Sequence, residues 1–249
     1  MSMKVYHQKD QAQGDFNHGA ILENKPIGFP QDYGRLQPYS NLFYWAHAWT
    51  PGEKSLIPEH PHQGFEILSF VLEGSLEHYD DKNGWEPLEK GDVQIIRSGS
   101  GIRHAEMVNK TTSFFQIWFD PNINKTIKEA AGYESYSSES FDREVSDGIT
   151  KIIYHDAGRG IQMVSPGIEM YELQMSPGSH SLGLVSGKVR SIYVIKGHLK
   201  VDGTEAGDHS FLITQEEESQ FEILEECRLF IVDSLIDPGY KTYATYRSL

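Results

Sequence analysis

Apolar residues along this chain gather in short runs that turn-forming residues separate. The first clear run spans residues 41–49, and Pro51-Gly52 ends it. In the next run, over residues 65–79, apolar side chains occupy alternate positions, which is typical of β-strands because successive side chains point to opposite faces. Those positions are Leu68, Phe70, Leu72 and Leu76. Gly74 interrupts the run, as expected where one strand bends into the next.

The same order of elements occurs twice along the chain. Residues 71–77 (Val-Leu-Glu-Gly-Ser-Leu-Glu) are echoed by residues 194–200 (Val-Ile-Lys-Gly-His-Leu-Lys), and Gly91-Asp92 is echoed by Gly207-Asp208. Further strands are predicted at 93–96, 102–108, 114–119, 220–224 and 229–232. Short strands, glycine-rich turns and almost no helical periodicity predict an all-β chain with two β-barrels in tandem.

This repeat suggests how the chain divides into domains. We expect an N-terminal barrel in residues 1–125, a polar connector in 126–150 and a C-terminal barrel in 151–249. The connector contains a Ser- and Glu-rich patch and one possible short helix at 125–131. Residues 1–40 are polar and rich in Gly, Asn, Gln and Pro, with short apolar pieces that could form edge strands.

Composition narrows the class of protein. The 249 residues are enough for one large or two small cores. The net charge of −14 argues against sequence-independent binding of DNA or RNA, which requires Lys and Arg, and against anionic membrane surfaces. Cys227 is the single cysteine, so no intrachain disulfide forms, and we expect a packed thiol. No apolar stretch has the length of a signal peptide or a membrane span, so we expect a cytoplasmic protein.

Candidate metal ligands flank the alternating run. His60 and His62 stand at i and i+2, as do His104 and Glu106, so each pair shares one face of a strand. If the two strands meet inside a barrel, three imidazoles and a carboxylate converge on one point. Glu66 has the parity of the first pair, so parity alone leaves Glu66 and Glu106 as competing carboxylates. Single His-x-His pairs are mostly solvated, but two pairs around a spacer of barrel size favour a metal.

The donor types indicate which ions fit. Imidazole and carboxylate suit first-row transition ions, and four protein ligands leave one or two positions open on Fe, Mn, Ni, Cu or Co. An ion with open positions can bind an organic chelate or dioxygen. Zinc stays an alternative, although a structural zinc more often closes its shell with thiolates, and this chain has one cysteine.

These motifs resemble the pirin family of the cupin superfamily. The resemblance is dense over residues 40–120, and looser pieces of it extend into the C-terminal half. It is carried by residues 60–66 (His-Pro-His-Gln-Gly-Phe-Glu), 72–75, 91–94 and 99–107. It implies two cupin-type barrels of double-stranded β-helix or jelly-roll topology, with iron, Fe²⁺ or Fe³⁺, in the first. The family's three histidines and one glutamate map to His60, His62, His104 and Glu106, which makes Glu66 a near neighbour of the site.

The second barrel lacks these ligands. Superposing the two repeats pairs His60, His62, His104 and Glu106 with Gly183, Val185, Gln220 and Glu222, respectively. His180 and His209 lie nearby, but we interpret two stray histidines as partners in local hydrogen bonds. We therefore expect a metal-free second barrel that serves packing and shields the first, and the resemblance agrees.

An open metal site favours chemistry on a chelating substrate. The 3-hydroxyl and 4-carbonyl of a flavonol form a five-membered chelate with a metal, which lowers the hydroxyl pKa and gives an electron-rich enolate able to react with O₂. Glu106 could detach and accept that proton, so that it serves as both ligand and catalytic base. The resemblance implies quercetin 2,3-dioxygenase chemistry, in which the ring opens and carbon monoxide is lost. We expect a dioxygenase that takes a small aromatic chelating substrate and O₂.

A second hypothesis is a metal- and redox-dependent protein-interaction module. The family includes a human pirin that is a nuclear, iron-dependent partner of a transcription factor, so the resemblance implies a possible protein partner. The acidity of this chain permits protein partners but disfavours direct contact with nucleic acid. A third hypothesis is another cupin reaction, an isomerase or decarboxylase that uses Mn.

Five further residues have testable interpretations. We expect His78 to be a buried, hydrogen-bonded histidine, and Arg103 to reach solvent or an acidic partner. Gln116 is a polar residue in an apolar run and is a candidate partner for a metal ligand. Phe115 and Trp118 are expected in the core, with a place in the wall of a substrate pocket as the alternative.

Overall fold

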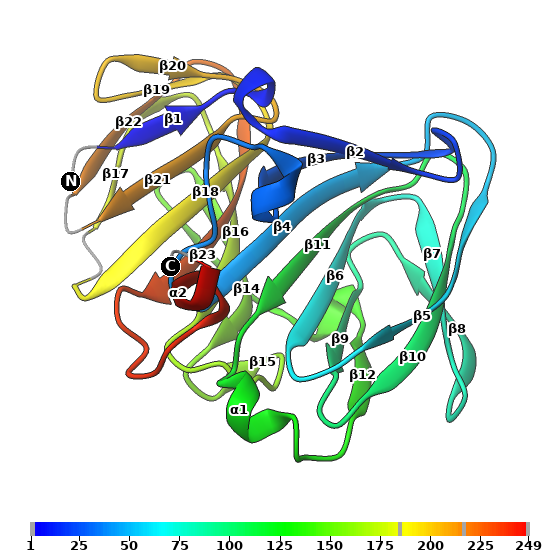
Figure 1. Cartoon of the computed structure of the whole chain (residues 1–249). Coiled ribbons are helices and arrows are strands. Elements are labelled where there is room, and N and C mark those ends of the chain that lie inside the picture. Colours follow the sequence, from blue (N-terminus) through cyan, green and yellow to red (C-terminus); the bar gives the residue numbers. More distant parts are fainter. Residues whose placement is uncertain (1–2, 184–185, 216–217, 248–249) are drawn as a thin grey trace. The chain divides into compact units, whose positions relative to one another are not determined.

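The computed structural model describes residues 3–183, 186–215 and 218–247, and the chain divides into two compact units (Figure 1). The N-terminal unit comprises Gln11–Ser140, Met163–Ser165 and Tyr240–Leu249. The C-terminal unit comprises Met1–Asp10, Phe141–Gln162 and Pro166–Gly239. Antiparallel strands dominate both units, which confirms the predicted all-β class.

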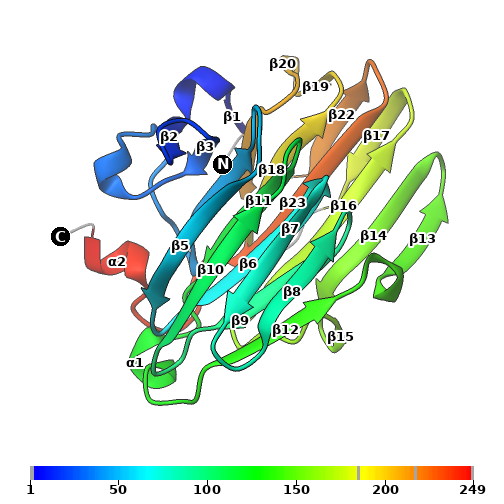
Figure 2. The same ribbon diagram turned by 90° about the vertical axis from the view of Figure 1, so that its right-hand side faces the viewer.

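Two antiparallel sheets build the N-terminal unit. The larger sheet contains, in spatial order, β12 (Gly132–Tyr136), β9 (Val93–Arg97), β6 (Glu66–Glu73), β11 (Ser113–Phe119), β4 (Leu42–Trp49), β3 (Ile21–Ile27) and β2 (Ala12–Phe16). The smaller sheet contains β5 (Ser55–His62), β10 (Ile102–Val108), β7 (Ser75–Asp80) and β8 (Gly84–Glu89), which lie side by side in Figure 2. Short helical elements are η2 (Pro30–Asp32), α1 (Ile123–Thr126), η3 (Ser138–Ser140) and α2 (Tyr243–Arg247).

The hydrophobic core of this unit lies between its two sheets. Both sheets contribute to one buried cluster, which contains Ile21, Ala48, Ile57, Val71, Leu76, Leu88, Val108 and Phe114. The alternate residues Leu68 and Leu72 are buried as predicted, but Ile67 and Val71, which have the opposite parity, are buried too. Strand β6 is therefore covered on both faces, and alternation shows only part of its burial.

Tight turns connect the strands where the sequence places glycine. Gly74 joins β6 to β7 with φ at +72°, and a Cβ there would lie 2.8 Å from Thr112 Cα. A side chain at Gly74 would therefore clash with the backbone and strain φ. Residues 81–83 form the turn between β7 and β8. The short helix expected at 125–131 is found at Ile123–Thr126, since Asp120 Oδ1 accepts hydrogen bonds from the backbone N–H groups of Asn122 and Ile123 and starts the helix earlier.

The C-terminal unit repeats this architecture. Its larger sheet contains, in spatial order, β1 (Lys4–Tyr6), β21 (Phe211–Gln215), β18 (Lys188–Lys196), β23 (Cys227–Leu235), β16 (Glu169–Met175), β14 (Ile149–Asp156) and β13 (Asp142–Ser146), with β15 (Arg159–Gly160) paired to β14. Its smaller sheet contains β17 (Gly178–Leu182), β22 (Ser219–Ile223), β19 (Leu199–Val201) and β20 (Thr204–Ala206), and η1 (Gln8–Asp10) follows β1.

Strand order confirms the internal repeat. The order β17-β22-β19-β20 in one unit matches β5-β10-β7-β8 in the other, and β21-β18-β23-β16 matches β9-β6-β11-β4. Residues 126–150, expected as a connector, contain β12, which pairs with β9, and β13, which pairs with β14. No helix in the described part of the chain is long and apolar enough to cross a membrane.

Candidate metal centre

Strands β5 and β10 bring the predicted ligand pairs together. They pair antiparallel, with His60 directly opposite His104 and His62 opposite Ile102. Residues directly opposite in an antiparallel pair have Cβ atoms about 5 Å apart, and diagonal neighbours stay within reach of long side chains. This register therefore places three imidazoles at one end of the smaller sheet.

A β-bulge in β5 changes the side of the sheet to which its side chains point. Three steps along β5, from Ile57 to His60, are matched by two steps along β10, from Glu106 to His104. Residues three apart on a regular strand face opposite sides, but the extra residue lets Ile57 and His60 face the same side. Pro58 is tolerated here because β5 is an edge strand and the bulge leaves a residue unpaired.

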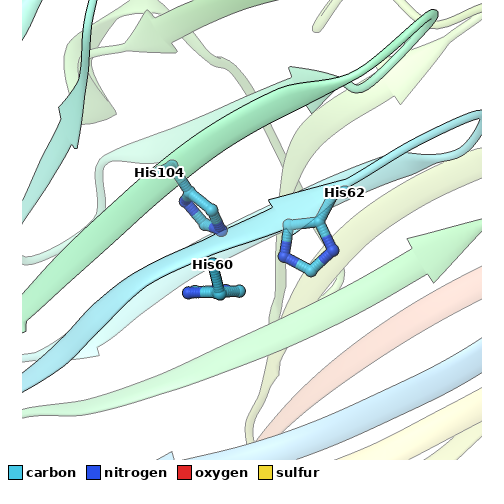
Figure 3. Close-up of side chains that lie close together, drawn as sticks. All are labelled: His60, His62 and His104. Carbon is cyan, nitrogen blue, oxygen red and sulfur yellow. The ribbon is translucent and has the colours of Figure 1, made fainter.

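Three imidazoles converge in the resulting site (Figure 3). The ligand nitrogens of His60, His62 and His104 lie within 4.8 Å of one another. Ring centroids are 4.3 Å apart for His60 and His104, 4.7 Å for His60 and His62, and 4.9 Å for His62 and His104. His104 is fully buried, whereas His60 and His62 are half-buried. The predicted convergence of the three histidines is thus observed.

The electrostatics of the cluster suit a cation. Burial, together with the charges of His60 and His62, lowers the pKa of His104 to about 2. Burial also lowers the pKa of His62 to about 4, with a further contribution from His60. Both rings are therefore neutral at pH 7 and offer lone pairs, which is the form that binds metals.

Hydrogen bonding around the rings agrees with a metal site. Both nitrogens of His104 are buried without a hydrogen-bond partner among the described residues. An unpaired buried nitrogen is unfavourable unless something else satisfies it, and a metal ion does so. His60 Nδ1 lies 2.9 Å from Pro58 O, so the Nδ1–H donates to this carbonyl and leaves Nε2 with the lone pair. The donors present fit a first-row transition ion.

Glu106 lies beside the cluster in a polar cradle. Its Oε1 accepts hydrogen bonds from Gln94 Nε2 at 2.9 Å and Ser69 Oγ at 3.4 Å, and its Oε2 accepts one from Gln116 Nε2 at 2.8 Å. Burial raises the pKa of Glu106 to about 7, although the three donors act to lower it. Among the described residues, the ligand atoms that lie within 4.8 Å of one another belong to the three histidines, so Glu106 stands outside that group.

Glu66, the competing carboxylate, accepts hydrogen bonds from another segment of the chain. The chain turns at Gly64 after β5 ends, so Glu66 starts β6 in the other sheet. Its Oε1 accepts from Val164 N at 2.7 Å, and its Oε2 accepts from Ser165 N at 2.9 Å and from Ser165 Oγ at 2.5 Å. Glu66 therefore anchors the segment Met163–Ser165, while Glu106 lines the same cavity as His60 and His62.

A cavity of about 560 Å³ adjoins the cluster and is large enough for a small organic ligand. The aromatic residues that line it include Phe29, Tyr44 and Trp118. The ring centroids of Tyr44 and Trp118 are 4.6 Å apart, and those of Phe29 and Tyr44 are 5.0 Å apart. Trp118 Nε1 donates to Gln116 Oε1 at 3.3 Å, so Gln116 links this wall to Glu106.

Most of the single-residue interpretations are confirmed. His78 is fully buried, and its Nε2 lies 2.9 Å from Asp80 Oδ2. Arg103 Nε donates to Glu59 Oε1 at 2.5 Å on an exposed surface. Gln116 contacts Glu106 as expected. Phe115 is a core residue, but Trp118 takes the alternative place in the cavity wall.

Residues singled out in the C-terminal unit have local partners. His180 Nε2 lies 2.9 Å from Ser176 O, and His209 Nδ1 lies 3.3 Å from Tyr193 OH. Cys227 is buried, and burial raises the pKa of its thiol to about 11, so it is a packed thiol as expected. Of the positions paired with the candidate ligands, Gln220 and Glu222 are exposed and Val185 lies outside the described residues.

Residues on the larger-sheet side of the cavity were not among the predicted site residues. Glu23 and Lys25 of β3 line it together with Gly14 of β2, although this polar N-terminal segment was assigned no function. The available signal was Ile21-Leu22-Glu23-Asn24-Lys25-Pro26-Ile27, in which two charges sit between apolar ends of a strand. Buried charges in such a place suggest a site.

The two β-sandwich units have matching strand order, which defines a double cupin. One unit also has clustered histidines beside a cavity, which form a candidate metal site. The pirin family model matches residues 25–119. The chain is 30% identical over 220 residues to a quercetin 2,3-dioxygenase of Escherichia coli K12, covering 86% of this chain and 91% of that protein. The chain belongs to the pirin family.

Two further comparisons agree. Pirin of Homo sapiens is 29% identical over 190 residues, which are 73% of this chain and 63% of that protein. The crystal structure of the bacterial pirin YhhW from Escherichia coli in complex with nickel(II) superposes with a TM-score of 0.74 at 21% identity, and the match covers 94% of this chain and 99% of that chain. The expected pair of cupin barrels is thereby confirmed.

Proposed function

We propose that this protein is a mononuclear iron protein that opens flavonol-like chelating substrates with O₂. His60, His62 and His104 would hold the ion with Glu106 as the fourth ligand, and Mn, Ni, Cu, Co or Zn are alternatives at the same donors. The observation that carries the proposal is a set of neutral, converging imidazoles beside a cavity with an aromatic wall. The similarity to a quercetin 2,3-dioxygenase supports the same substrate class.

The residues around the site have separate tasks in this proposal. An iron ion, when bound, would polarise the chelating oxygens and provide a path for electrons to O₂. Glu106 accepts the proton of the substrate hydroxyl. Gln94 and Gln116 orient its two oxygens. Tyr44 and Trp118 pack against the substrate rings and keep water away from them.

The overall reaction consumes one O₂ per flavonol and releases carbon monoxide and a ring-opened ester. Iron-loaded protein should therefore bleach the flavonol absorbance aerobically, with carbon monoxide formed in equal amount. His62→Ala should lose both the metal and the activity, while His180→Ala, in the other unit, should keep both. Elemental analysis of the same preparations reports the metal independently of turnover.

The outcomes separate the two main hypotheses. Absence of bound metal in the wild-type protein would remove the proposed site altogether. Stoichiometric iron without any loss of flavonol would reject the dioxygenase and leave the metal-dependent interaction module. In that case ferric and ferrous forms should differ in their affinity for a protein partner.

A further inference from the structure

The cavity contains a second group of polar side chains on the larger sheet. Glu23 and Lys25 of β3 are only 5% and 9% exposed, and both line the cavity. Lys25 Nζ lies 2.9 Å from Glu23 Oε1 and 3.2 Å from Asp32 Oδ1. Tyr44 OH donates to Glu23 Oε2 at 3.2 Å. The histidines project from the smaller sheet, so metal donors and this ion pair belong to different walls of one cavity.

Gly14 makes room for the ion pair. A Cβ at this position would lie 2.3 Å from Glu23 Oε1 and 3.0 Å from Lys25 Nζ. The carboxylate and the ammonium are therefore packed directly against the backbone of β2. Their positions are fixed by this contact, by Asp32 and by Tyr44, which is the preorganisation that ligand recognition requires.

The hydrogen-bond donors and acceptors of Lys25 and Glu23 that remain for a ligand match a hydroxyl group. An ammonium has three protons, and two of those on Lys25 are directed to Glu23 and Asp32. Within the described part of the chain, each oxygen of Glu23 accepts one hydrogen bond, from Lys25 or from Tyr44, which leaves lone pairs for a ligand. The pair can thus offer one donor and one acceptor to a ligand, and a hydroxyl uses both.

The charge balance argues against an anionic ligand here. Two carboxylates, those of Glu23 and Asp32, surround a single ammonium. Burial lowers the pKa of Lys25, but the charges and hydrogen bonds of Glu23 and Asp32 together raise it by more, so the pKa is raised overall and the ammonium stays charged. The local sum is negative, and a carboxylate, sulfate or phosphate on the ligand would be repelled in a partly dry cavity.

We infer that Glu23 and Lys25 are specificity-determining residues that bind a neutral phenolic hydroxyl on the part of the substrate remote from its metal-chelating oxygens. The inference rests on the proposed function, because it assumes that the chelating edge lies at the histidines. An unsubstituted ring would leave the Lys25 proton and the Glu23 lone pairs without a partner. The cavity therefore selects hydroxylated aromatic chelates over unsubstituted and anionic ones.

Binding of a matched set of probes tests this selection. Iron-loaded protein is titrated anaerobically by calorimetry with 3-hydroxyflavone, with its 7-hydroxy and 4′-hydroxy derivatives, and with its 4′-carboxylate. Anaerobic conditions prevent turnover, and the two hydroxyl positions mark the two ends of the molecule. One hydroxyl derivative should bind about tenfold more tightly than the parent, as expected for hydrogen bonds to charged groups, and the carboxylate should bind more weakly than the parent.

Variants assign this preference to the pair. Glu23→Gln keeps the size of the side chain and should reduce the tenfold ratio between hydroxyl derivative and parent to about one. It should also improve binding of the carboxylate. Lys90→Met, which breaks the exposed pair of Lys90 with Glu73, is the control and should keep the wild-type ratio. Thermal unfolding verifies that each variant is folded.

Failure of the inference differs from failure of the proposed function. If 3-hydroxyflavone itself does not bind iron-loaded wild-type protein, the chelating site is wrong. If it binds but neither hydroxyl derivative binds more tightly, the inference alone is overturned, and this result needs no variant. A tenfold preference that persists in Glu23→Gln would also overturn it.

Discussion

Replacing Glu106 by glutamine tests whether this carboxylate is placed to bind a cation. Glu106 is fully buried, and burial raises its pKa from 4.5 to about 7 despite hydrogen bonds from Gln94, Ser69 and Gln116. In metal-free protein its ionised form is therefore unfavourable. Glutamine has nearly the same shape and carries no charge at any pH. Its amide NH2 replaces one accepting oxygen, but this loss is the same at every pH, so the pH dependence of the exchange reports the ionisation.

The sign and size of the effect follow from the two pKa values. The folded protein holds the Glu106 proton more tightly than the unfolded chain, so stability falls as the pH rises from 4.5 through 7. Each pKa unit corresponds to about 1.4 kcal/mol, which gives a penalty of about 3 kcal/mol at pH 8 and almost none at pH 4.5. Glu106→Gln should remove this penalty and raise the melting temperature of metal-free protein by roughly 6–12 °C at pH 8 relative to its effect at pH 4.5.

Calorimetric unfolding of wild-type and variant protein at both pH values measures this difference. With metal bound, the sign should reverse, because the variant lacks the fourth ligand that we propose and gains less stability from the ion. Glu73→Gln changes an exposed glutamate in a surface ion pair and should show neither effect. A stability difference between wild-type and Glu106→Gln that is the same at pH 4.5 and pH 8 would refute the reasoning.

Three further predictions concern the stability of residues that build or surround the site. Gly74→Ala should destabilise the protein by about 2 kcal/mol more than Gly84→Ala in urea denaturation, because both glycines have positive φ but only Gly74 meets backbone atoms. Glu66→Gln should cost about 2 kcal/mol and speed amide exchange at Ser165, since it weakens hydrogen bonds to a charged acceptor; unchanged exchange would contradict this. Burial lowers the pKa of His104, so stability present above pH 6.5 is lost as the pH falls, and metal-free wild type should lose about 3 kcal/mol relative to His104→Asn between pH 7 and pH 4.

The sequence was sufficient to predict which residues share a strand face near the metal site. His60 and His62 are two apart on one strand, as are His104 and Glu106, and a period of two needs no tertiary information. The register in which the two strands pair could not be predicted in this way, because it includes a bulge in β5 near Pro58. Alternation from Glu66 back to His60 fails for a related reason, since the chain turns between them and enters another sheet.

Residues on the far wall of the cavity could not be found by periodicity. Glu23 and Lys25 look like solvated charges in a polar segment, and only the packing of Gly14 against them shows that they are buried. Trp118 was expected in the core because an apolar strand such as β11 does not reveal which face borders a cavity. Periodicity indicates which side chains are buried. It does not indicate which of the buried side chains border a cavity.

Burial shifts the pKa values of the histidines and of Glu106 in opposite directions, and a single bound cation would suit both kinds of group. Burial drives His62 and His104 to their neutral forms and drives Glu106 toward its protonated form, so the cluster without a metal carries little charge near neutral pH. A metal ion needs the lone pairs of neutral imidazoles, and its charge offsets the burial of an ionised carboxylate. Gln94 and Gln116 each donate a hydrogen bond to one Glu106 oxygen and hold the carboxyl group in place. In the proposed site, proton and metal would therefore compete for the Glu106 carboxylate, and this competition would allow a metal ligand to act as a base toward a substrate proton.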